Sequence, residues 1–223
     1  MPPPSAMDAD PLIINKEAFI LLQGLYAITD EILTPDHSIL SQAETALQAG
    51  VKLLQYRHKS GKDSEVEEVC IKLQRLCRQY QALFIINDRP HLAQAIGADG
   101  LHVGIEDMDF AQARKIFAKG VIGVSCYGDV ARARLAQDAG ADYVAFGSFF
   151  PSPTKPSSKV VPMQVLSEAK AALTIPVCAI GGINAANIHE ISAHGPDMIS
   201  VVSAVFAGDI PSNVARLNAV MQG

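Results

Sequence analysis

The stretch LFIINDRPHLAQAIGADGLHV, residues 83–103, contains the repeating unit from which the fold can be inferred. The apolar run LFIIN at 83–87 predicts one strand, and GLHV at 100–103 predicts the next. Between them Pro90 opens a helix-like segment that ends at the phrase Gly97-Ala98-Asp99. Strands that are apolar on both faces are typical of a parallel sheet covered by helices. This stretch therefore predicts one strand–helix–strand unit of such a sheet.

The same unit recurs along the chain. Six further apolar runs predict strands: LYAIT (25–29), KLLQYR (52–57), VIGVS (121–125), YVAFGS (143–148), VCAIGG (177–182) and MISVVS (198–203). Helix-like segments separate the strands, for example 38–50, 64–80 and 129–140. Eight units spaced by roughly 25 residues predict an α/β fold, a closed (β/α)8 TIM barrel in a single domain. An open dinucleotide-binding sheet is the alternative, but no G-x-G-x-x-G follows the first strand.

We expect residues 1–24 to form an N-terminal extension, partly disordered and with room for a short helix over 12–23. Residues 25–223 would then form the catalytic barrel. The first residues are rich in proline and acidic, and they lack the basic and apolar regions of a signal peptide. No apolar run approaches the roughly 20 residues of a membrane span.

Composition narrows the class of protein. Apolar residues make up 49% of the 223 residues, so a large core can form, and the net charge of −5 argues against nonspecific binding of nucleic acid. The four cysteines form no C-x-x-C pair, which fits free, buried thiols in a reducing compartment. We expect a soluble cytoplasmic protein whose partners are small molecules, with neither nucleic acid nor membrane among them. The oligomeric state is not specified.

The second strand ends in the sequence Gln55-Tyr56-Arg57-His58-Lys59. Because side chains alternate along a strand, Gln55, Arg57 and Lys59 share one face and can converge on one ligand. In a barrel of this kind, catalytic groups lie at the C-terminal ends of the strands. Two cations on one face indicate an anion between them; a solvated Arg/Lys pair is the alternative.

Two carboxylates follow neighbouring strands. The third strand ends Asn87-Asp88, and the loop after the fourth carries Glu106 and Asp107. Strands in a parallel sheet lie about 4.8 Å apart, so Asp88 and Asp107 can reach one cation, and oxygen ligands suit Mg²⁺. The alternative is that each aspartate caps the helix that follows it. Glu106 is interpreted as a solvated neighbour.

Small and hydroxyl residues end the later strands. Ser125 ends the fifth strand, and Ser148 leads into the loop FFPSPTKP, in which Pro-x-Pro holds an extended backbone beside Lys155. Gly181-Gly182 and Ser203 follow the seventh and eighth strands, the pair of loops that commonly binds phosphate in this fold. The sequence thus indicates a site for two phosphorylated ligands, one of them bound to a metal. A solvated surface loop is the alternative for FFPSPTKP.

Other polar residues are interpreted as structural. His102 is expected to be a hydrogen-bonded histidine inside the barrel, whereas His91, His189 and His194 fall on helices without metal-ligand spacing. Thr29-Asp30 is expected to end the first strand. No arrangement of serine or cysteine with histidine indicates a covalent nucleophile.

Six motifs in order, Q-Y-R-x-K, I-N-D, A-D-G-L-H-V-G-x-x-D, G-V-S, F-P-S-P-T-K and A-I-G-G-I, resemble those of the thiamine phosphate synthase family, from about Leu25 to Phe206. The resemblance implies a Mg²⁺-dependent transferase built on a (β/α)8 barrel. Such an enzyme joins hydroxymethylpyrimidine diphosphate to thiazole phosphate and releases diphosphate. It also implies a dissociative reaction, in which a pyrimidinylmethyl cation is captured by the thiazole nitrogen. Where the thiazole is supplied as its carboxylate, decarboxylation follows.

The resemblance also implies roles for individual residues. The pyrimidine diphosphate would be bound by Gln55, Arg57, Lys59, Asn87, Ser125 and Lys155, and Mg²⁺ by Asp88 and Asp107. The thiazole would be bound by Ser152, Pro153 and Thr154. Its phosphate would be bound by Gly182, Val202 and Ser203. Tyr56, His58 and Gly181 are included among the substrate-binding residues, and Arg57, Lys59, Ser125 and Lys155 are expected to be catalytic.

Two positions depart from the family pattern. Ile105 replaces a common Gln and so loses an amide, and Ser152 replaces a frequent Thr but keeps a hydroxyl. Two other functions stay open: an isomerase resembling the thiazole tautomerases, and a regulator that binds thiazole phosphate without catalysis. The paired carboxylates favour the synthase over both.

Overall fold

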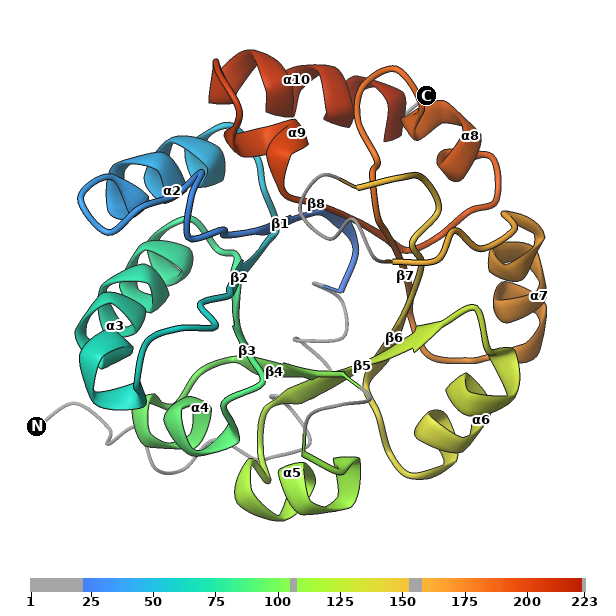
Figure 1. Ribbon diagram of the computed structural model, residues 1–223, viewed down its shortest axis with the longest axis horizontal. Helices are drawn as coiled ribbons and strands as arrows, with labels where there is room; N and C mark the ends of the chain where they lie inside the picture. The colour runs from blue at the N-terminus through green and yellow to red at the C-terminus, as the bar shows by residue number, and fades with distance from the viewer. Residues whose placement is uncertain (1–21, 105–107, 153–157, 222–223) are drawn as a thin grey trace, which may run out of the picture.

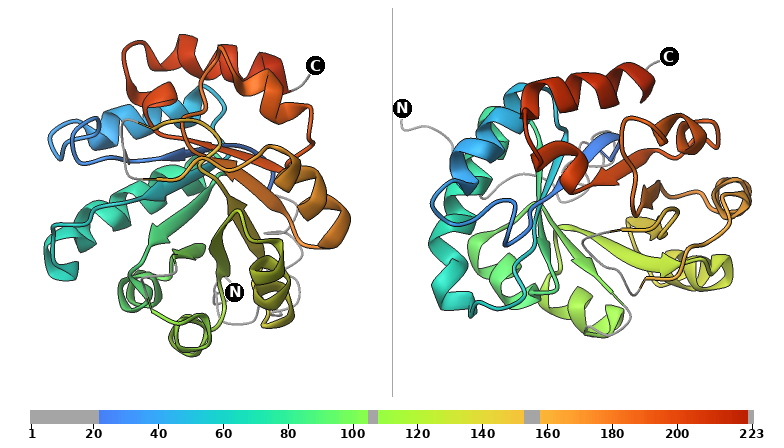
Figure 2. Two further views of the ribbon diagram at one scale, coloured as in Figure 1. Left: turned by 45° about the vertical axis from the view of Figure 1, so that its right-hand side comes forward. Right: turned by 45° about the horizontal axis from the view of Figure 1, so that its top comes forward.

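The computed structural model describes residues 22–104, 108–152 and 158–221. They form a closed barrel of eight parallel strands in the order β1 to β8, with each strand paired to its neighbours in sequence and β8 paired to β1. Helices surround the sheet in the view down the barrel (Figure 1) and stay outside it in both tilted views (Figure 2). The predicted (β/α)8 barrel is confirmed.

The strands lie close to the predicted runs. They are β1 (Gly24–Ile28), β2 (Leu53–Tyr56), β3 (Leu83–Asn87), β4 (Gly100–Val103), β5 (Val121–Tyr127), β6 (Tyr143–Phe146), β7 (Val177–Ile180) and β8 (Met198–Val201). β3 and β4 match their predicted ranges. β5 continues past Ser125 through an irregularity in its pairing with β6, and β6 and β7 end before the glycines and serines that were included in the predicted runs.

The helices follow each strand in turn. They are α2 (Ile39–Gln48), α3 (Asp63–Gln79), α4 (Pro90–Ile96), α5 (Phe110–Ile116), α6 (Val130–Asp138), α7 (Gln164–Ala172), α8 (Ile188–Ser192), α9 (Ser203–Phe206) and α10 (Ile210–Met221). Most of the helix predicted over 12–23, like most of the N-terminal extension, lies outside the described residues, and its last two residues, Leu22 and Gln23, are not helical. Every helix among the described residues is too short or too polar to cross a membrane.

Two apolar layers hold the fold together. The outer layer packs strand residues such as Leu54, Phe84 and Val144 against the helices, and the inner layer fills the barrel with Leu53, Ile85 and other side chains. This division follows from the alternation of side chains along each strand. All four cysteines are buried and unpaired, as the sequence predicted.

Candidate active site

A cavity of about 260 Å³ opens at the C-terminal ends of the strands. The structure brings eleven of the predicted site residues to its wall: Gln55, Arg57, Lys59, Asn87, Asp88, Ser125, Ser152, Gly181, Gly182, Val202 and Ser203. These residues are far apart in the sequence, and they meet because the barrel gathers the C-terminal ends of its strands at one mouth. Asp107, Pro153, Thr154 and Lys155, together with Ile105 and Glu106, lie outside the described residues.

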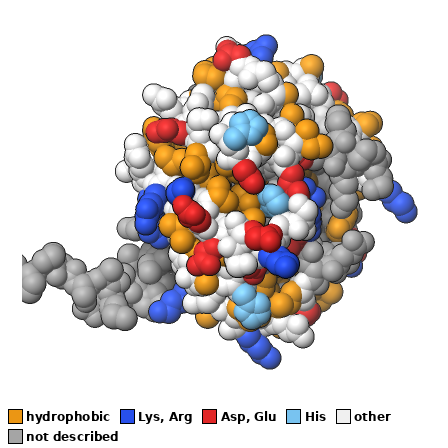
Figure 3. Space-filling view, turned by 60° about the vertical axis from the view of Figure 1, so that its left-hand side comes forward, with side chains coloured by type: hydrophobic (Ala, Val, Ile, Leu, Met, Phe, Trp, Pro, Cys, Tyr) orange, Lys and Arg blue, Asp and Glu red, His pale blue; other side chains and the backbone are white. Residues whose placement is uncertain are grey.

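Tyr56 and His58 do not reach this cavity. Their rings stack with centroids 6.0 Å apart, and both line a separate hollow beside α2 and α3. Alternation along the strand explains the outcome, because the face opposite Gln55 and Arg57 points away from the barrel interior. On this side of the molecule, Figure 3 shows acidic, basic and hydrophobic side chains intermixed. The structure thus gives Tyr56 and His58 no direct access to a ligand in the cavity.

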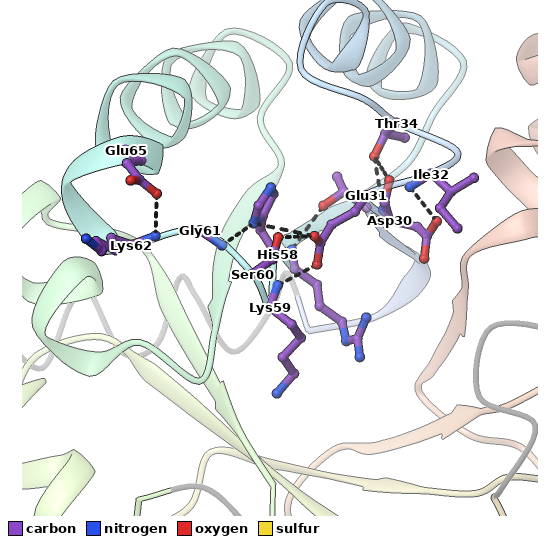
Figure 4. A network of polar contacts seen from close by, with 12 residues as sticks. Asp30, Glu31, Ile32, Thr34, His58, Lys59, Ser60, Gly61, Lys62 and Glu65 are labelled. Carbon is purple, nitrogen blue, oxygen red and sulfur yellow. Dashed lines mark hydrogen bonds and ion pairs between the residues drawn. The ribbon is translucent and has the colours of Figure 1, made fainter.

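The loop after β2 is held from the side of β1 by Glu31. The Glu31 carboxylate accepts hydrogen bonds from the backbone N–H of Lys59 at 2.7 Å and from the Ser60 hydroxyl at 2.5 Å. Figure 4 shows Glu31 reaching across to this loop while the Lys59 side chain points away from it. These bonds, the Ser60 hydroxyl first, lower the pKa of Glu31, so the carboxylate stays charged in its supporting role.

The same loop is held from the side of β3 by Arg89. Its guanidinium donates to the carbonyl oxygens of His58 at 2.7 Å and Gly61 at 2.5 Å, and to the Asp63 carboxylate at 2.6 Å. Arg89 directly follows Asp88 in the chain. The loop that carries Arg57 and Lys59 is therefore fixed between two neighbouring strand ends.

Asp88 lies on the cavity wall between two donors. Its carboxylate accepts from the Lys59 ammonium and from the Asn87 amide. Its backbone takes the left-handed conformation (φ 59°), which aspartate tolerates better than most residues. The capping alternative is wrong for Asp88, because α4 has Arg89 at its N-cap and no capping side chain. The N-cap of α5 is Asp109, whose carboxylate accepts from the Ala111 N–H.

A divalent cation at this end of the cavity fits Asp88. Mg²⁺ is commonly bound through one or two carboxylates, with water and substrate phosphate completing its shell. Among the described residues, no group of three histidine, cysteine or acidic side chains could hold a metal by itself. A cation held by Asp88 would therefore need further oxygen ligands, such as water or a phosphate group.

Polar side chains also meet in the barrel interior, where Tyr26 and His102 line the cavity. His102 is almost fully buried, and its ring nitrogens lie 2.9 Å from the Tyr143 hydroxyl and 2.9 Å from the Ser125 hydroxyl. This confirms the prediction of a hydrogen-bonded interior histidine. Tyr26 and Tyr143 complete the network, whereas the sequence pattern predicts them only as members of apolar strands.

The opposite side of the mouth is built from two glycines. Gly181 and Gly182 have φ angles of 105° and 66°, which favour glycine. Phe150 donates its N–H to the Gly181 carbonyl at 3.0 Å, so the loops after β6 and β7 lie against each other. Val202 and Ser203 close this side from β8 and α9. The cavity thus has a cationic and acidic side and a separate glycine-rich side.

Comparison with known proteins agrees with this arrangement. A family model described as thiamine monophosphate synthase matches residues 25–205. The chain is 47% identical over 200 residues to a thiamine-phosphate synthase of Acidithiobacillus ferrooxidans, covering 88% of this chain and 92% of the relative. It is 46% identical over 201 residues to that of Thioalkalivibrio sulfidiphilus, covering 90% and 95%.

A solved structure is also similar over most of the chain. The thiamine phosphate pyrophosphorylase from Pyrococcus furiosus superposes with a TM-score of 0.83 and 36% sequence identity, covering 90% of this chain and 96% of that one.

Proposed function

The chain belongs to the thiamine monophosphate synthase family, a family of transferases in thiamine biosynthesis, and on that premise we propose how its cavity performs the reaction. The cavity joins hydroxymethylpyrimidine diphosphate to thiazole phosphate, or to its carboxylate. The products are thiamine phosphate and diphosphate. The observation that carries this proposal is the presence of two chemically different ends in one cavity.

The pyrimidine diphosphate occupies the end formed by β2, β3 and β5. Gln55, Arg57, Lys59, Asn87 and Ser125 supply donors and positive charge there, and Asp88 takes Mg²⁺. The Asp107 and Lys155 positions lie outside the described residues, so their roles in binding the metal and the diphosphate stay predictions. When bound, Mg²⁺ would neutralise part of the diphosphate charge.

Thiazole phosphate occupies the end formed by β7 and β8. Its phosphate lies against Gly182, Val202 and Ser203, where backbone can approach an oxyanion closely. Ser152, on the loop after β6, contacts the thiazole. This assignment places the thiazole phosphate beside small residues. The cationic side chains of Arg57 and Lys59 then bind the diphosphate.

The reaction breaks one C–O bond and forms one C–N bond. The bond between the pyrimidine methylene carbon and the diphosphate oxygen breaks with its electron pair on oxygen, which leaves a pyrimidinylmethyl cation. The thiazole nitrogen lone pair then captures that carbon. Arg57 and Lys59 stabilise the charge that develops on the departing diphosphate, a contribution larger in the transition state than in the ground state.

The test is to incubate the protein with both substrates and to detect thiamine phosphate by mass. We expect product with Mg²⁺, little product in excess EDTA, and strongly reduced turnover for Asp88→Asn with an unchanged circular dichroism spectrum. Equal turnover in EDTA and Mg²⁺ would refute the metal assignment. A change in thiazole phosphate without the pyrimidine substrate would point to the isomerase instead.

A further inference from the structure

Five polar side chains form one continuous chain of hydrogen bonds through the barrel. Gln55 Nε2 lies 2.7 Å from the Tyr26 hydroxyl, which lies 3.0 Å from the Tyr143 hydroxyl. The Tyr143 hydroxyl lies 2.9 Å from His102 Nδ1, and His102 Nε2 lies 2.9 Å from Ser125 Oγ. The residues come from five strands, β2, β1, β6, β4 and β5. The chain thus joins Gln55 and Ser125 through the barrel, and Tyr26 and His102 line the same cavity with them.

The surrounding packing fixes this chain in place. Tyr26 and Tyr143 are 1% and 0% exposed, and burial raises the pKa of both phenols, so each hydroxyl keeps its proton. Gly123, next to Tyr143 in the sheet, leaves room for the phenol ring: a Cβ there would lie 1.9 Å from Tyr143 Cζ. The hydroxyl of Tyr143 is thereby held between Tyr26 and His102.

The first link gives the chain a starting direction. An amide NH₂ group can only donate, so Gln55 donates to the oxygen of Tyr26. The next two contacts can each run either way, but a buried hydroxyl hydrogen needs an acceptor. Within the chain, both phenol hydrogens are bonded when Tyr26 donates to the oxygen of Tyr143 and Tyr143 donates to the Nδ1 atom of His102. A neutral histidine that accepts at Nδ1 carries its proton on Nε2.

The last link decides what Ser125 offers to a ligand. In this direction His102 donates its Nε2–H to Ser125 Oγ at 2.9 Å, and the hydrogen of the Ser125 hydroxyl is directed elsewhere. Ser125 lies on the cavity wall. If the bonds ran in the opposite direction, Ser125 would donate to His102 and could only accept from a ligand.

We propose that this buried chain fixes Ser125 as a hydrogen-bond donor to the substrate, with Tyr26, Tyr143 and His102 as positioning residues. The group that meets Ser125 is a hydrogen-bond acceptor. Its assignment to the pyrimidine diphosphate rests on the proposed function, whereas the direction of the chain does not. The two parts can therefore be tested separately.

The direction is tested by the tautomer of His102. Protein labelled with ¹⁵N-histidine is measured by long-range ¹H–¹⁵N NMR without substrate, and His102→Gln identifies the His102 signals. We expect a protonated Nε2 and an unprotonated Nδ1 in the wild type. The opposite tautomer, or a ring protonated at both nitrogens at neutral pH, would overturn the proposal, whether or not the enzyme makes thiamine phosphate.

The effect on the substrate is tested with Tyr143→Phe, which removes one hydroxyl from the chain. We expect kcat/KM for the pyrimidine diphosphate to fall about tenfold, the scale of one hydrogen bond, with KM for thiazole phosphate unchanged. Tyr26→Phe breaks the chain farther from Ser125 and should cost less. The matched control is Tyr80→Phe, the same change at a tyrosine away from the cavity whose hydroxyl donates to Glu44, with wild-type kinetics expected.

A double mutant separates positioning from general packing. If Tyr143 acts through Ser125, Ser125→Ala/Tyr143→Phe should be no less active than Ser125→Ala alone. Losses that multiply in the double mutant would overturn the proposal, as would equal losses in Tyr143→Phe and the Tyr80→Phe control. Circular dichroism and Tm of each variant show that the barrel is intact. A wild-type protein that makes no thiamine phosphate would refute the proposed function while leaving the NMR result to judge the chain.

Discussion

Arg89 offers a quantitative test of how the site is held together. Its side chain is 15% exposed and donates two hydrogen bonds to carbonyl oxygens of the loop that carries Arg57 and Lys59. A third bond reaches Asp63, which is 48% exposed. Arg89→Met removes all three bonds and keeps an unbranched side chain of similar length.

The expected cost follows from the burial of each bond. A hydrogen bond to a charged group contributes about 1.5–3 kcal/mol, and an exposed ion pair about 0–1 kcal/mol. The released carbonyl groups regain water, so we take the lower end, about 3 kcal/mol for the two loop bonds. If this energy positions the loop, kcat/KM should fall about 100-fold, since about 1.4 kcal/mol corresponds to a factor of ten. The Asp63 bond should matter little.

The assay measures thiamine phosphate formation by Arg89→Met, Arg89→Lys and Asp63→Asn. We expect a loss of about 100-fold for the first, partial recovery in Arg89→Lys because one ammonium cannot reproduce the planar fork, and near wild-type rates for Asp63→Asn. Tm is recorded for each variant. A kcat/KM for Arg89→Met within threefold of wild type would refute the reasoning, as would an equal loss in Asp63→Asn.

Three further predictions concern other parts of the fold. Glu31→Ala should lower kcat/KM about three- to tenfold, whereas Glu65→Ala, which removes a carboxylate bound to the same loop at the start of α3, should change kcat/KM less than twofold. Because hydrogen bonds lower the pKa of Glu31, its support should persist at neutral pH and be lost in acid, as amide hydrogen exchange across pH would show. Gly123→Ala should lower Tm by several degrees, since its Cβ would meet the Tyr143 ring, and an unchanged Tm would contradict that packing. Burial raises the pKa of Cys126 to about 12 and that of the other three thiols as well, so a thiol reagent should react only as the protein unfolds.

The sequence predicted the barrel because each strand is short, apolar and followed by a helix. The β3 and β4 ranges agree with the structure, since Asp88 and Gly104 interrupt the apolar pattern directly after each strand. β6 and β7 were predicted too long. Gly147 and Gly181 have left-handed φ angles of 154° and 105°, which turn the chain out of the sheet although the run stays apolar.

Alternation along β2 predicts which residues at its end line the cavity together. It does not predict what the residues on the opposite face contact. Gln55, Arg57 and Lys59 lie on the cavity wall, whereas Tyr56 and His58 lie outside. Alternation places Tyr56 and His58 on the outer face of this strand end, so their proximity in sequence to Gln55 and Arg57 does not bring them to the cavity.

The residues that hold the site could not be found from one sequence. Tyr26 and Tyr143 are 117 positions apart, and Glu31 meets the Lys59 N–H across 28 positions. Nothing local distinguishes such a tyrosine from one that only packs, because its partner becomes a neighbour only when the barrel closes. His102 was correctly expected to be hydrogen-bonded, but its partners were not specified.

The glycine pair after β7 shows why one sequence signal can have two physical causes. Gly181-Gly182 was interpreted as a phosphate-binding turn, yet a Cβ at Gly182 would lie 2.4 Å from the Pro151 carbonyl oxygen. A side chain at Gly182 would therefore displace the loop after β6 and impair both substrates, whatever binds there. Ser203→Ala leaves this packing intact and tests the anion site alone. We expect it to raise KM for thiazole phosphate with KM for the pyrimidine diphosphate unchanged, and an equal rise in both would place the phosphate elsewhere in the cavity.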